Sequence, residues 1–261
     1  MIDLHCHVLP GVDDGPDRLA GSLELCRAAY AAGTRTVVAT PHVSWRYPDV
    51  DAATVRAGVS TLNKALSQTA IELEVLSGAE ITLSRAAELP DRELDALRLG
   101  AGRCVLVEMP SSSGAAGIEN ATALIADRGY DVVIAHPERS PALQRNPELL
   151  ERLVEGGALC CVTARALTGH GSHGAPAFAW ELIEAQLVHL IASDAHDAVR
   201  RPPDLVPELQ RAGLAQSQID YFTVQAPLAV IQGATPPAPP VVTRSRFSWL
   251  RGLAHRASAA R

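Results

Sequence analysis

Short apolar runs alternate with longer segments of helical period along most of the chain. Between the first two runs, apolar residues recur three or four positions apart at Leu19, Leu23, Cys26 and Tyr30, and Gly33 can end this helix. Other helices are predicted at residues 52–68, 118–128, 147–155, 177–186 and 204–211. The apolar runs predict seven strands, at residues 2–4, 36–39, 73–77, 104–108, 132–135, 159–162 and 188–192. This alternation indicates an α/β fold with parallel strands, and seven strands suggest a barrel.

The pattern stops at a proline-rich segment, GATPPAPPVVT, which fills residues 233–243. Proline has no amide hydrogen and a fixed φ, so the four prolines within residues 236–240 exclude a helix or a central strand. We therefore predict a domain at residues 1–232, an extended linker at 233–243 and a basic tail at 244–261. The tail would either be disordered or, because Phe247, Leu250 and Leu253 recur every three residues, lie on an anionic membrane or a partner.

Composition is that of a globular protein, since 47% of the 261 residues are apolar, enough for a buried core. The five cysteines are irregularly spaced and form no CxxC pair, which argues against a disulfide framework or a structural zinc site. No signal peptide is visible, and no apolar run reaches the roughly 18 residues that a membrane span needs. We expect a soluble protein in the cytoplasm.

Charge divides the chain into an acidic body and a basic end. Five of the 23 basic residues are arginines in residues 244–261, which contain no acid, so the rest has 18 bases against 29 acids and a net charge of −11. Nucleic-acid-binding domains usually carry a basic surface. The acidic body therefore predicts that the protein has no nucleic acid partner.

Histidine and carboxylate side chains follow six of the predicted strands, next to Pro, Gly or Ser turn residues. Singly these signals are weak, because a His-x-His pair also suits a polar surface and an Asp-Asp pair is more often a turn or helix cap. Their shared position carries more information, since the carboxyl ends of parallel barrel strands meet at one mouth. The residues expected at this mouth are His5, His7, Asp14, His42, Glu80, Glu108, His136, Asp194 and His196. Imidazole and carboxylate ligands suit zinc, manganese or iron, and nine of them are enough for two or three ions bridged by carboxylates.

Six stretches of the chain also resemble a known group of proteins. DLHCHVLPGVDDG, ATPH, GAEI, VEMP, AHPER, and SDAH followed by RRPP closely resemble the polymerase-and-histidinol-phosphatase (PHP) superfamily. Within it they look most like the bacterial manganese-dependent protein tyrosine phosphatases of capsule and exopolysaccharide synthesis, the CpsB/CapC-like family. The resemblance covers residues 1–228. It implies a distorted (β/α)7 barrel of the PHP type, with a trinuclear metal centre at the C-terminal mouth of the strands.

The resemblance implies a role for each residue of this centre. One ion would be held by His5, His7, Glu80 and Asp194. A second ion would be held by Glu80, Glu108 and His136, and a third by Asp14, His42 and His196. Arg139 and Arg201 match the phosphate-binding arginines of the family and would clamp the phosphoryl oxygens with their forked N–H groups. Asp13 would be a turn residue or would support a neighbouring ligand.

The same resemblance implies the cofactor and the substrate. Three divalent ions are expected, manganese before iron or zinc. The substrate would be phosphotyrosine on a protein, and the partner a membrane-associated tyrosine autokinase that regulates capsule or exopolysaccharide synthesis. Clustered divalent ions lower the pKa of water from about 15.7 to about 7, so hydroxide rather than a side chain would attack the phosphomonoester.

Spacing argues against the cysteine-based tyrosine phosphatases, which need an arginine six residues after the catalytic cysteine. In this chain the residues at that position after the five cysteines are Val12, Ala32, Pro110, Ala166 and Leu167. We therefore expect the cysteines to be small core residues. Cys6, between two predicted ligands, could make the site sensitive to oxidation.

One stretch, CCVTARALTGHGSHG, departs from the family pattern. Relatives commonly carry an amide side chain near the end of this strand, where this chain has Thr163 and Ala164, so hydrogen bonding around the centre or contact with substrate would differ. His170 and His173 follow in a glycine-rich loop and are expected to be exposed rather than additional ligands.

Three other functions share part of the pattern. A histidinol-phosphate phosphatase of the same superfamily would use the same metals on a small amine-bearing substrate, although the LPGVDDG stretch favours the tyrosine phosphatase. A polymerase-associated exonuclease is opposed by the acidic body. A scaffold protein with an inactive site is opposed by the presence of all nine ligand positions.

Overall fold

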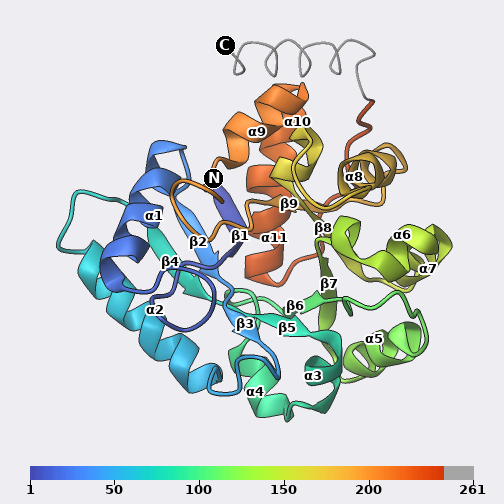
Figure 1. Cartoon of the computed structure of the whole chain (residues 1–261), viewed down its shortest axis with the longest axis horizontal. Helices are drawn as coiled ribbons and strands as arrows, with labels where there is room; N and C mark the ends of the chain where they lie inside the picture. Colours follow the sequence, from blue (N-terminus) through green and yellow to red (C-terminus); the bar gives the residue numbers. More distant parts are fainter. Residues whose placement is uncertain (244–261) are drawn as a thin grey trace.

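The computed structural model describes residues 1–243, in which strands alternate with helices (Figure 1). The strands are β1 (Ile2–Cys6), β2 (Thr36–Ala39), β3 (His42–Val43), β4 (Glu74–Ser77), β5 (Glu80–Thr82), β6 (Cys104–Glu108), β7 (Asp131–Ala135), β8 (Leu159–Thr163) and β9 (Leu190–Ala192). The longer helices are α1 (Leu19–Ala31), α2 (Ala52–Leu66), α5 (Ile118–Asp127), α7 (Pro147–Glu155), α8 (Ala175–Glu184) and α9 (Leu205–Ala212). Shorter helical segments are α3 (Leu83–Glu88), α4 (Asp91–Ala96), η1 (Pro137–Arg139), α6 (Pro141–Arg145), η2 (Ala164–Thr168), α10 (Gln216–Asp220), η3 (Tyr221–Gln225) and α11 (Ala226–Gln232).

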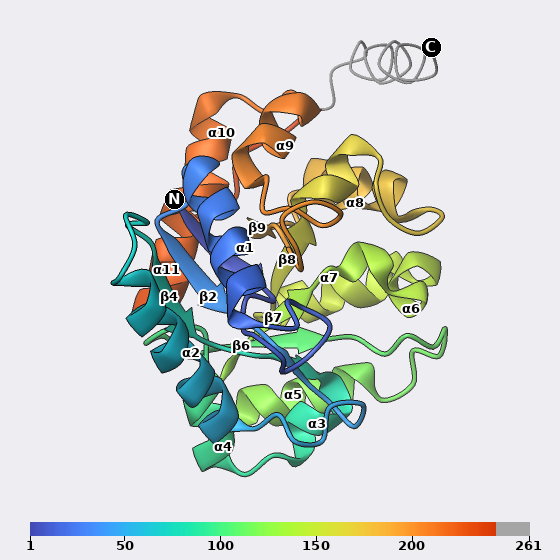
Figure 2. The same ribbon diagram turned by 60° about the vertical axis from the view of Figure 1, so that its left-hand side comes forward.

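The strands form two parallel sheets. The smaller sheet has the order β1-β2-β4, and the larger has the order β3-β5-β6-β7-β8-β9. Figures 1 and 2 show the helices around the strands, with α1 and α2 beside the smaller sheet and α5, α7 and α8 beside the larger one. Most strand residues are buried, as is usual for parallel sheets covered by helices. The fold is thus mixed α/β, as predicted.

The chain crosses from the smaller sheet to the larger one at two breaks that the sequence pattern did not reveal. Pro41, which has no amide hydrogen, separates β2 from β3, and its carbonyl accepts a hydrogen bond from the Glu80 amide at 3.1 Å. Gly78 separates β4 from β5, where a Cβ would lie 2.6 Å from the Val38 Cγ1. His42 and Glu80, expected in loops, therefore lie opposite each other on the short parallel strands β3 and β5.

The two sheets also meet where β1 ends and the chain leaves β9. Cys6 and Ala195 form a single parallel bridge. The Asp194 amide donates to the His5 carbonyl and the His7 amide to the Ala195 carbonyl, each at 2.8 Å. The hydrogen-bonded ladder is interrupted between the sheets, so the strands do not form one closed sheet.

Element boundaries differ from the sequence prediction mainly at short segments. β1 continues to Cys6 rather than residue 4, and β9 begins at Leu190 rather than residue 188. The short helices α3, α4, α6, α10 and α11 were not predicted. They span about two turns or fewer, too few for a helical period to stand out from the sequence.

Residues 233–243 follow the predicted domain boundary but do not form a free linker. Helix α11 ends at Gly233, whose φ of 75° is in the left-handed region that favours glycine. Beyond it, the Pro237 carbonyl accepts a hydrogen bond from the Tyr221 hydroxyl at 2.7 Å, and the Val241 carbonyl accepts one from Gln218 at 2.8 Å. Residues 234–243 form no helix or strand and are hydrogen-bonded to the domain. The predicted basic tail lies outside the described residues, and no helix within residues 1–243 is both long and apolar enough to cross a membrane.

Candidate metal centre

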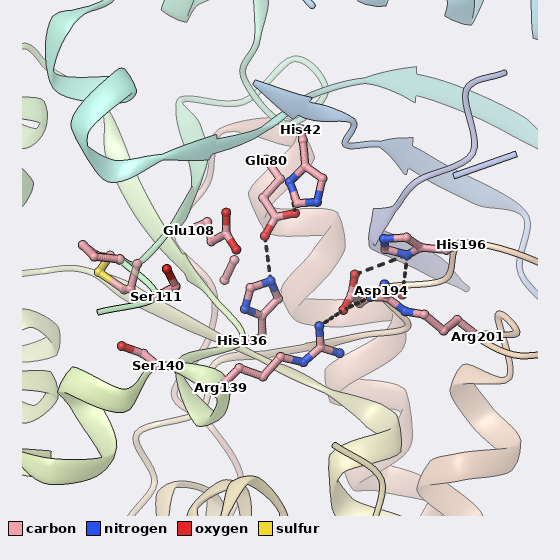
Figure 3. Close-up of a pocket in the computed structure, with 13 residues that line it drawn as sticks. His42, Glu80, Glu108, Ser111, His136, Arg139, Ser140, Asp194, His196 and Arg201 are labelled. Atoms are coloured by element: carbon pink, nitrogen blue, oxygen red, sulfur yellow. Dashed lines mark hydrogen bonds and ion pairs between the residues drawn. The ribbon is translucent and has the colours of Figure 1, made fainter. Parts of the chain in front are cut away.

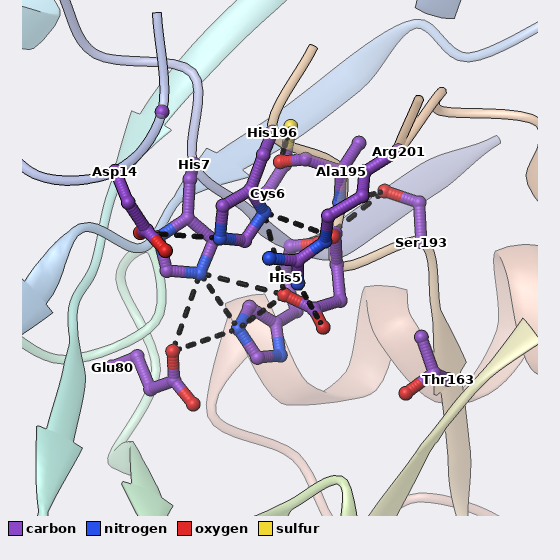
Figure 4. Close-up of polar contacts among 12 residues, drawn as sticks. His5, Cys6, His7, Asp14, Glu80, Thr163, Ser193, Ala195, His196 and Arg201 are labelled. Carbon is purple, nitrogen blue, oxygen red and sulfur yellow. Dashed lines mark hydrogen bonds and ion pairs between the residues drawn. The ribbon is translucent and has the colours of Figure 1, made fainter. Parts of the chain in front are cut away.

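Six of the nine predicted ligands and both predicted arginines line one cavity of about 140 Å³ (Figure 3). The cavity is lined by His42, Glu80, Glu108, His136, Arg139, Asp194, His196 and Arg201. Figure 4 shows His5, His7 and Asp14 beside Glu80 and His196 in the same cluster. The structure thus brings together side chains from β1, β3, β5 and β6 and from the segments after β1, β7 and β9.

Glu80 is the centre of this cluster, with only 1% of its side chain exposed. Its Oε1 lies 2.6 Å from the His136 Nε2. Its Oε2 lies 3.2 Å from the Nε2 atoms of both His5 and His7, and 3.1 Å from the His42 Nδ1. One carboxylate therefore faces four imidazoles, which is the arrangement expected of a ligand shared between ions.

Asp194 connects the cluster to the arginines. Its Oδ1 lies 3.6 Å from the His5 Nε2 and 3.5 Å from the His7 Nε2. On the opposite side, its Oδ2 accepts from Arg139 at 2.6 Å and from Arg201 at 2.8 Å. The two guanidinium groups are thereby held at the edge of the cluster, where about a third of each side chain is exposed.

The Asp14 carboxylate forms the more open side of the cluster. Its Oδ1 lies 3.2 Å from the His196 Nε2 and 3.5 Å from the His42 Nε2, and 42% of its side chain is exposed. His42 thus faces Asp14 through Nε2 and Glu80 through Nδ1. This imidazole links the predicted third ion site to the carboxylate shared by the other two.

Asp13 supports the cluster without facing it. Its Oδ2 lies 2.7 Å from the His7 Nδ1 and accepts from the His42 amide at 3.0 Å, while its Oδ1 accepts from the Gly15 amide at 3.0 Å. A carboxylate on one ring nitrogen of a histidine fixes the direction of the other nitrogen. Asp13 therefore turns the His7 Nε2 toward Glu80, and of the two roles left open for Asp13, the structure supports that of a residue which positions a ligand.

Two buried polar atoms show that the cluster is suited to cations. Neither the Glu80 Oε2 nor the His196 Nε2 has a hydrogen-bond partner within residues 1–243. Imidazole nitrogens lie 3.1–3.2 Å from the Glu80 Oε2, and the Asp14 Oδ1 lies 3.2 Å from the His196 Nε2, but none of these contacts has hydrogen-bond geometry. Because buried polar atoms are nearly always satisfied, both atoms are suited to binding a cation. Ligand atoms of three sets lie within 4.8 Å of one another: His5, His7 and Glu80; His42, Glu80 and Glu108; and His7, Asp14, His42 and His196. Imidazole and carboxylate groups at this density fit divalent cations of the manganese, iron and zinc type.

Comparison with known proteins agrees with this geometry. Residues 1–214 match the family model described as capsular polysaccharide synthesis, CpsB/CapC. The chain belongs to the CpsB/CapC family. The tyrosine-protein phosphatase YwqE of Bacillus subtilis is 39% identical over 77% of this chain and 79% of its own length. The putative tyrosine-protein phosphatase CapC of Staphylococcus aureus is 31% identical over 77% of this chain and 79% of its own length.

A solved structure of the same family is also similar. It comes from a study of YwqE from Bacillus subtilis and CpsB from Streptococcus pneumoniae, which describes both as metal-dependent tyrosine phosphatases. The TM-score is 0.80 at 34% identity, and the match covers 94% of this chain and all of the solved one.

In this CpsB/CapC family member, charge compensation decides which groups of the cluster are ionised. Burial would raise the pKa of the Asp194 carboxyl, but His5 and the Arg139 guanidinium hold it well below its usual range. Burial would likewise lower the pKa of His7, but the carboxylates of Asp13, Asp194 and Glu80 raise it well above its usual value. Anionic carboxylates and protonated imidazoles thus neutralise one another when no cation is bound.

For Glu108 and two of the histidines, the effect of burial on the pKa outweighs that of the neighbouring opposite charges. Burial, aided by the nearby charge of Glu80, raises the pKa of Glu108 to about 7. Burial lowers the pKa of His42 and of His196. Neutral imidazoles are the form that binds metal, so these two histidines are ready to act as ligands near neutral pH.

The backbone is strained at two of the predicted ligands. His136 has a φ of 29° and Asp194 a φ of 52°, in a region that residues other than glycine seldom adopt. Such conformations cost about 1–3 kcal/mol each and persist where the surroundings hold them in place. Both strained residues lie just after a strand, His136 after β7 and Asp194 after β9, where the chain reaches the candidate metal centre.

Some residues that shape the centre were not predicted from the sequence. Asp3 is fully buried and accepts hydrogen bonds from the Ser193 amide at 3.0 Å and the His5 amide at 3.4 Å, which joins β1 to the segment after β9. Tyr47 stacks on His42, with ring centroids 5.6 Å apart and ring planes 2° from parallel. Asp3 lies two residues before the predicted ligand His5, which was the only signal for it in the sequence. Its contact with Ser193 joins residues 190 positions apart and could not be predicted without the fold.

The remaining predictions for this region concern cysteines and loop histidines. All five cysteines are buried, as expected for core residues. Burial raises the pKa of the Cys6 thiol well above its usual value, which argues against easy oxidation. His170 and His173 are exposed, as predicted.

Proposed function

We propose that this protein is a metal-dependent protein tyrosine phosphatase that hydrolyses phosphotyrosine on a protein substrate. The observation that carries the proposal is the gathering of nine potential metal ligands in one cluster, six of which line a cavity together with two arginines, in a member of the CpsB/CapC family. The named activity of YwqE and the metal dependence given for the solved relatives support it.

The centre would hold three divalent ions, manganese before iron or zinc. We assign His5, His7, Glu80 and Asp194 to one ion, Glu80, Glu108 and His136 to the second, and Asp14, His42 and His196 to the third. The contacts of Glu80 with four imidazoles and of Asp14 with two support this assignment. Bound ions would acidify a water molecule and offset the negative charge of the phosphoryl group.

The chain's own cations complete the phosphate site. Arg139 and Arg201 both donate to the Asp194 Oδ2, which fixes the two guanidinium groups on one side of the cavity. Guanidinium presents several N–H donors in one plane, so each group can hold Asp194 and a phosphoryl oxygen at the same time. Donors fixed in advance stabilise the charge that develops on those oxygens during hydrolysis.

A cysteine nucleophile does not fit this site. A thiolate mechanism needs a cysteine whose pKa is lowered and which is accessible to substrate. Burial instead raises the pKa of Cys26 and of Cys104 to about 12, and Cys160 and Cys161 are also buried. Attack by water-derived hydroxide therefore remains the mechanism that the residues support.

The natural partner would be a membrane-associated tyrosine autokinase of capsule or exopolysaccharide synthesis, and the site of action the cytoplasm. The family description and the names of the relatives support a role in capsule synthesis. We also interpret the two parallel sheets as two arcs of a distorted (β/α)7 barrel, since they meet between β1 and β9 and at the breaks that lead into β3 and β5.

Substrate preference tests this function. With manganese present, the protein should hydrolyse a phosphotyrosyl peptide with a kcat/KM at least about a hundredfold above that for histidinol phosphate. That ratio corresponds to about 2.8 kcal/mol of transition-state binding. His136→Ala should remove most activity while leaving the circular dichroism spectrum unchanged. A preference for histidinol phosphate would instead support the related phosphatase of the superfamily.

A further inference from the structure

A second cavity, of about 380 Å³, adjoins the candidate metal centre and is unused by the proposed chemistry. It shares Arg139, Asp194 and Arg201 with the first cavity, which is much smaller at about 140 Å³. Its other walls come from the end of β8, from η1 and η2, and from the glycine-rich loop at residues 169–174. A phosphoryl group bound at the two arginines would therefore lie at the entrance to this cavity, which is large enough for a neighbouring part of the substrate.

Glu138, which lines the second cavity, is fully buried. Its Oε1 accepts the Thr163 amide at 3.0 Å and the Thr163 hydroxyl at 2.5 Å. Figure 4 shows Thr163 apart from the histidine cluster. The Glu138 Oε2 has no hydrogen-bond partner in the described chain. A buried carboxylate oxygen without a donor is unfavourable, so this atom marks a position for a donor on a ligand.

Arg165 supplies the complementary atom in the same cavity. Its Nη1 donates to the Arg200 carbonyl at 2.6 Å, which holds the side chain in place. Its Nε is buried and, among residues 1–243, has no acceptor. The residues that line the cavity therefore include one acceptor atom and one donor atom that are buried without partners, both on side chains that other contacts already fix.

The charges of the cavity select among possible ligands. A carboxylate on the substrate would face the buried Glu138, and an ammonium group would face Arg165 together with Arg139 and Arg201. A neutral amide group has both an N–H donor for Glu138 and a carbonyl acceptor for Arg165. A Ser or Thr hydroxyl is also neutral and both donates and accepts, but it does so through a single oxygen, whereas the amide presents its donor and its acceptor on separate atoms.

We propose that the second cavity binds the side-chain amide of an Asn or Gln close to the phosphotyrosine of the substrate, with Glu138 as its acceptor and Arg165 as its donor. This proposal rests on the proposed phosphatase function. It makes Glu138 and Arg165 determinants of sequence preference rather than of the hydrolysis itself.

The test uses phosphotyrosyl peptides flanked only by alanine, in which a single Asn replaces each of the three residues on either side of the phosphotyrosine in turn. With manganese present, Asn at one position should raise kcat/KM about tenfold over the all-alanine peptide. Asp at that position should give no such increase. The readout is the ratio between two peptides, so a partial loss of overall activity in a variant does not affect it.

Arg165→Lys keeps the positive charge but removes the Nε–H donor, and Glu138→Gln replaces the acceptor. In both variants the ratio should fall to within about twofold of one. Glu138 also holds Thr163, so Arg165→Lys decides alone if the Glu138 variant does not fold. Arg103→Lys is the matched control. Arg103 pairs with Asp131 at the amino ends of β6 and β7, whereas the two cavities lie at the carboxyl ends of the strands, so the ratio for this variant should stay near ten.

Equal rates for all peptides would overturn the amide site but leave the phosphatase function standing, with the Glu138 Oε2 bound to solvent only. A preference for Asp, or an Asn preference that persists in Arg165→Lys, would also overturn it. Failure to hydrolyse any phosphotyrosyl peptide would overturn both this proposal and the proposed function.

Discussion

At the scale of single residues, the predicted ligands can be identified from the sequence, whereas the residues that position them can be identified only from the structure. The imidazoles and carboxylates of the candidate centre stand out in the sequence because they lie at or shortly after the carboxyl ends of predicted strands. Asp13 lies beside one of them, yet its role is visible only through its 2.7 Å contact with the His7 Nδ1. Without this contact, the His7 ring could turn its Nε2 away from Glu80.

We expect Asp13→Asn to weaken manganese binding about 10- to 100-fold, because the amide cannot hold His7 as firmly as a carboxylate does. Activity on a phosphotyrosyl peptide should fall in parallel at limiting manganese and recover in part at high manganese. Manganese titration followed by a rate assay measures both effects. Asp17→Asn, at an exposed position in the same loop, is the control and should leave the affinity unchanged. Equal affinities in the two variants would show that Asp13 does not position the ligand.

The residues predicted from sequence and those missed differ for a physical reason. The structure brings together all nine predicted ligands and both predicted arginines, Arg139 and Arg201. This could be predicted because parallel strands have their carboxyl ends on the same side of the fold. Asp3 and Glu138 were missed because their partners, Ser193 and Thr163, are 190 and 25 positions away. Nothing in a short motif encodes such distant pairing.

At the scale of elements, the breaks between β2 and β3 and between β4 and β5 matter most. Each break carries the chain from one sheet to the other and places a predicted ligand, His42 or Glu80, at the first position of the new strand. The sequence showed the apolar runs of β2 and β4 but not β3 and β5, since strands of two and three residues have no readable alternation. The turn residues Pro41 and Gly78 were the only local signals.

We expect Gly78→Ala to lower the free energy of unfolding by about 1–3 kcal/mol. The added Cβ would lie 2.6 Å from the Cγ1 of Val38 in β2, and would push the segment between β4 and β5 away from β2. The displacement should reach Glu80, two residues later, and weaken manganese binding as well. Urea unfolding without metal and manganese titration measure the two effects separately. Gly114→Ala is the control, since its nearest neighbour is the Ser112 Oγ at 4.0 Å. An unfolding midpoint equal to that of the wild type would contradict the close approach.

At the scale of the whole molecule, the candidate metal centre fills the place where the two sheets meet. His5 belongs to the smaller sheet and Glu80 and Glu108 to the larger one, and Asp194 lies in the segment after β9, where its amide donates to the His5 carbonyl. Cations shared by these residues would tie the sheets together where hydrogen bonding between strands is interrupted. Metal binding should therefore stabilise the entire fold and not only the active site.

The pH dependence of this stabilisation follows from the ionisation of the centre. Although burial opposes it, neighbouring carboxylates raise the pKa of His7 and of His136. In the metal-free chain, protonation of these histidines contributes stability that is fully present below their unfolded pKa of about 6.5 and is lost as the pH rises through the folded values. Cations bind the unprotonated imidazole, so manganese has to displace these protons and part of the proton on Glu108.

We therefore expect the difference in unfolding temperature between the manganese-loaded and the EDTA-treated protein to widen as the pH rises from about 6 to about 8. Calorimetric titration with manganese at pH 7 in two buffers of different ionisation enthalpy should show net proton release. His170→Ala removes an exposed histidine outside the cluster and should leave the number of released protons unchanged, whereas His136→Ala should reduce it. A temperature difference that stays constant over this pH range would mean that the histidines are already unprotonated before the cation binds.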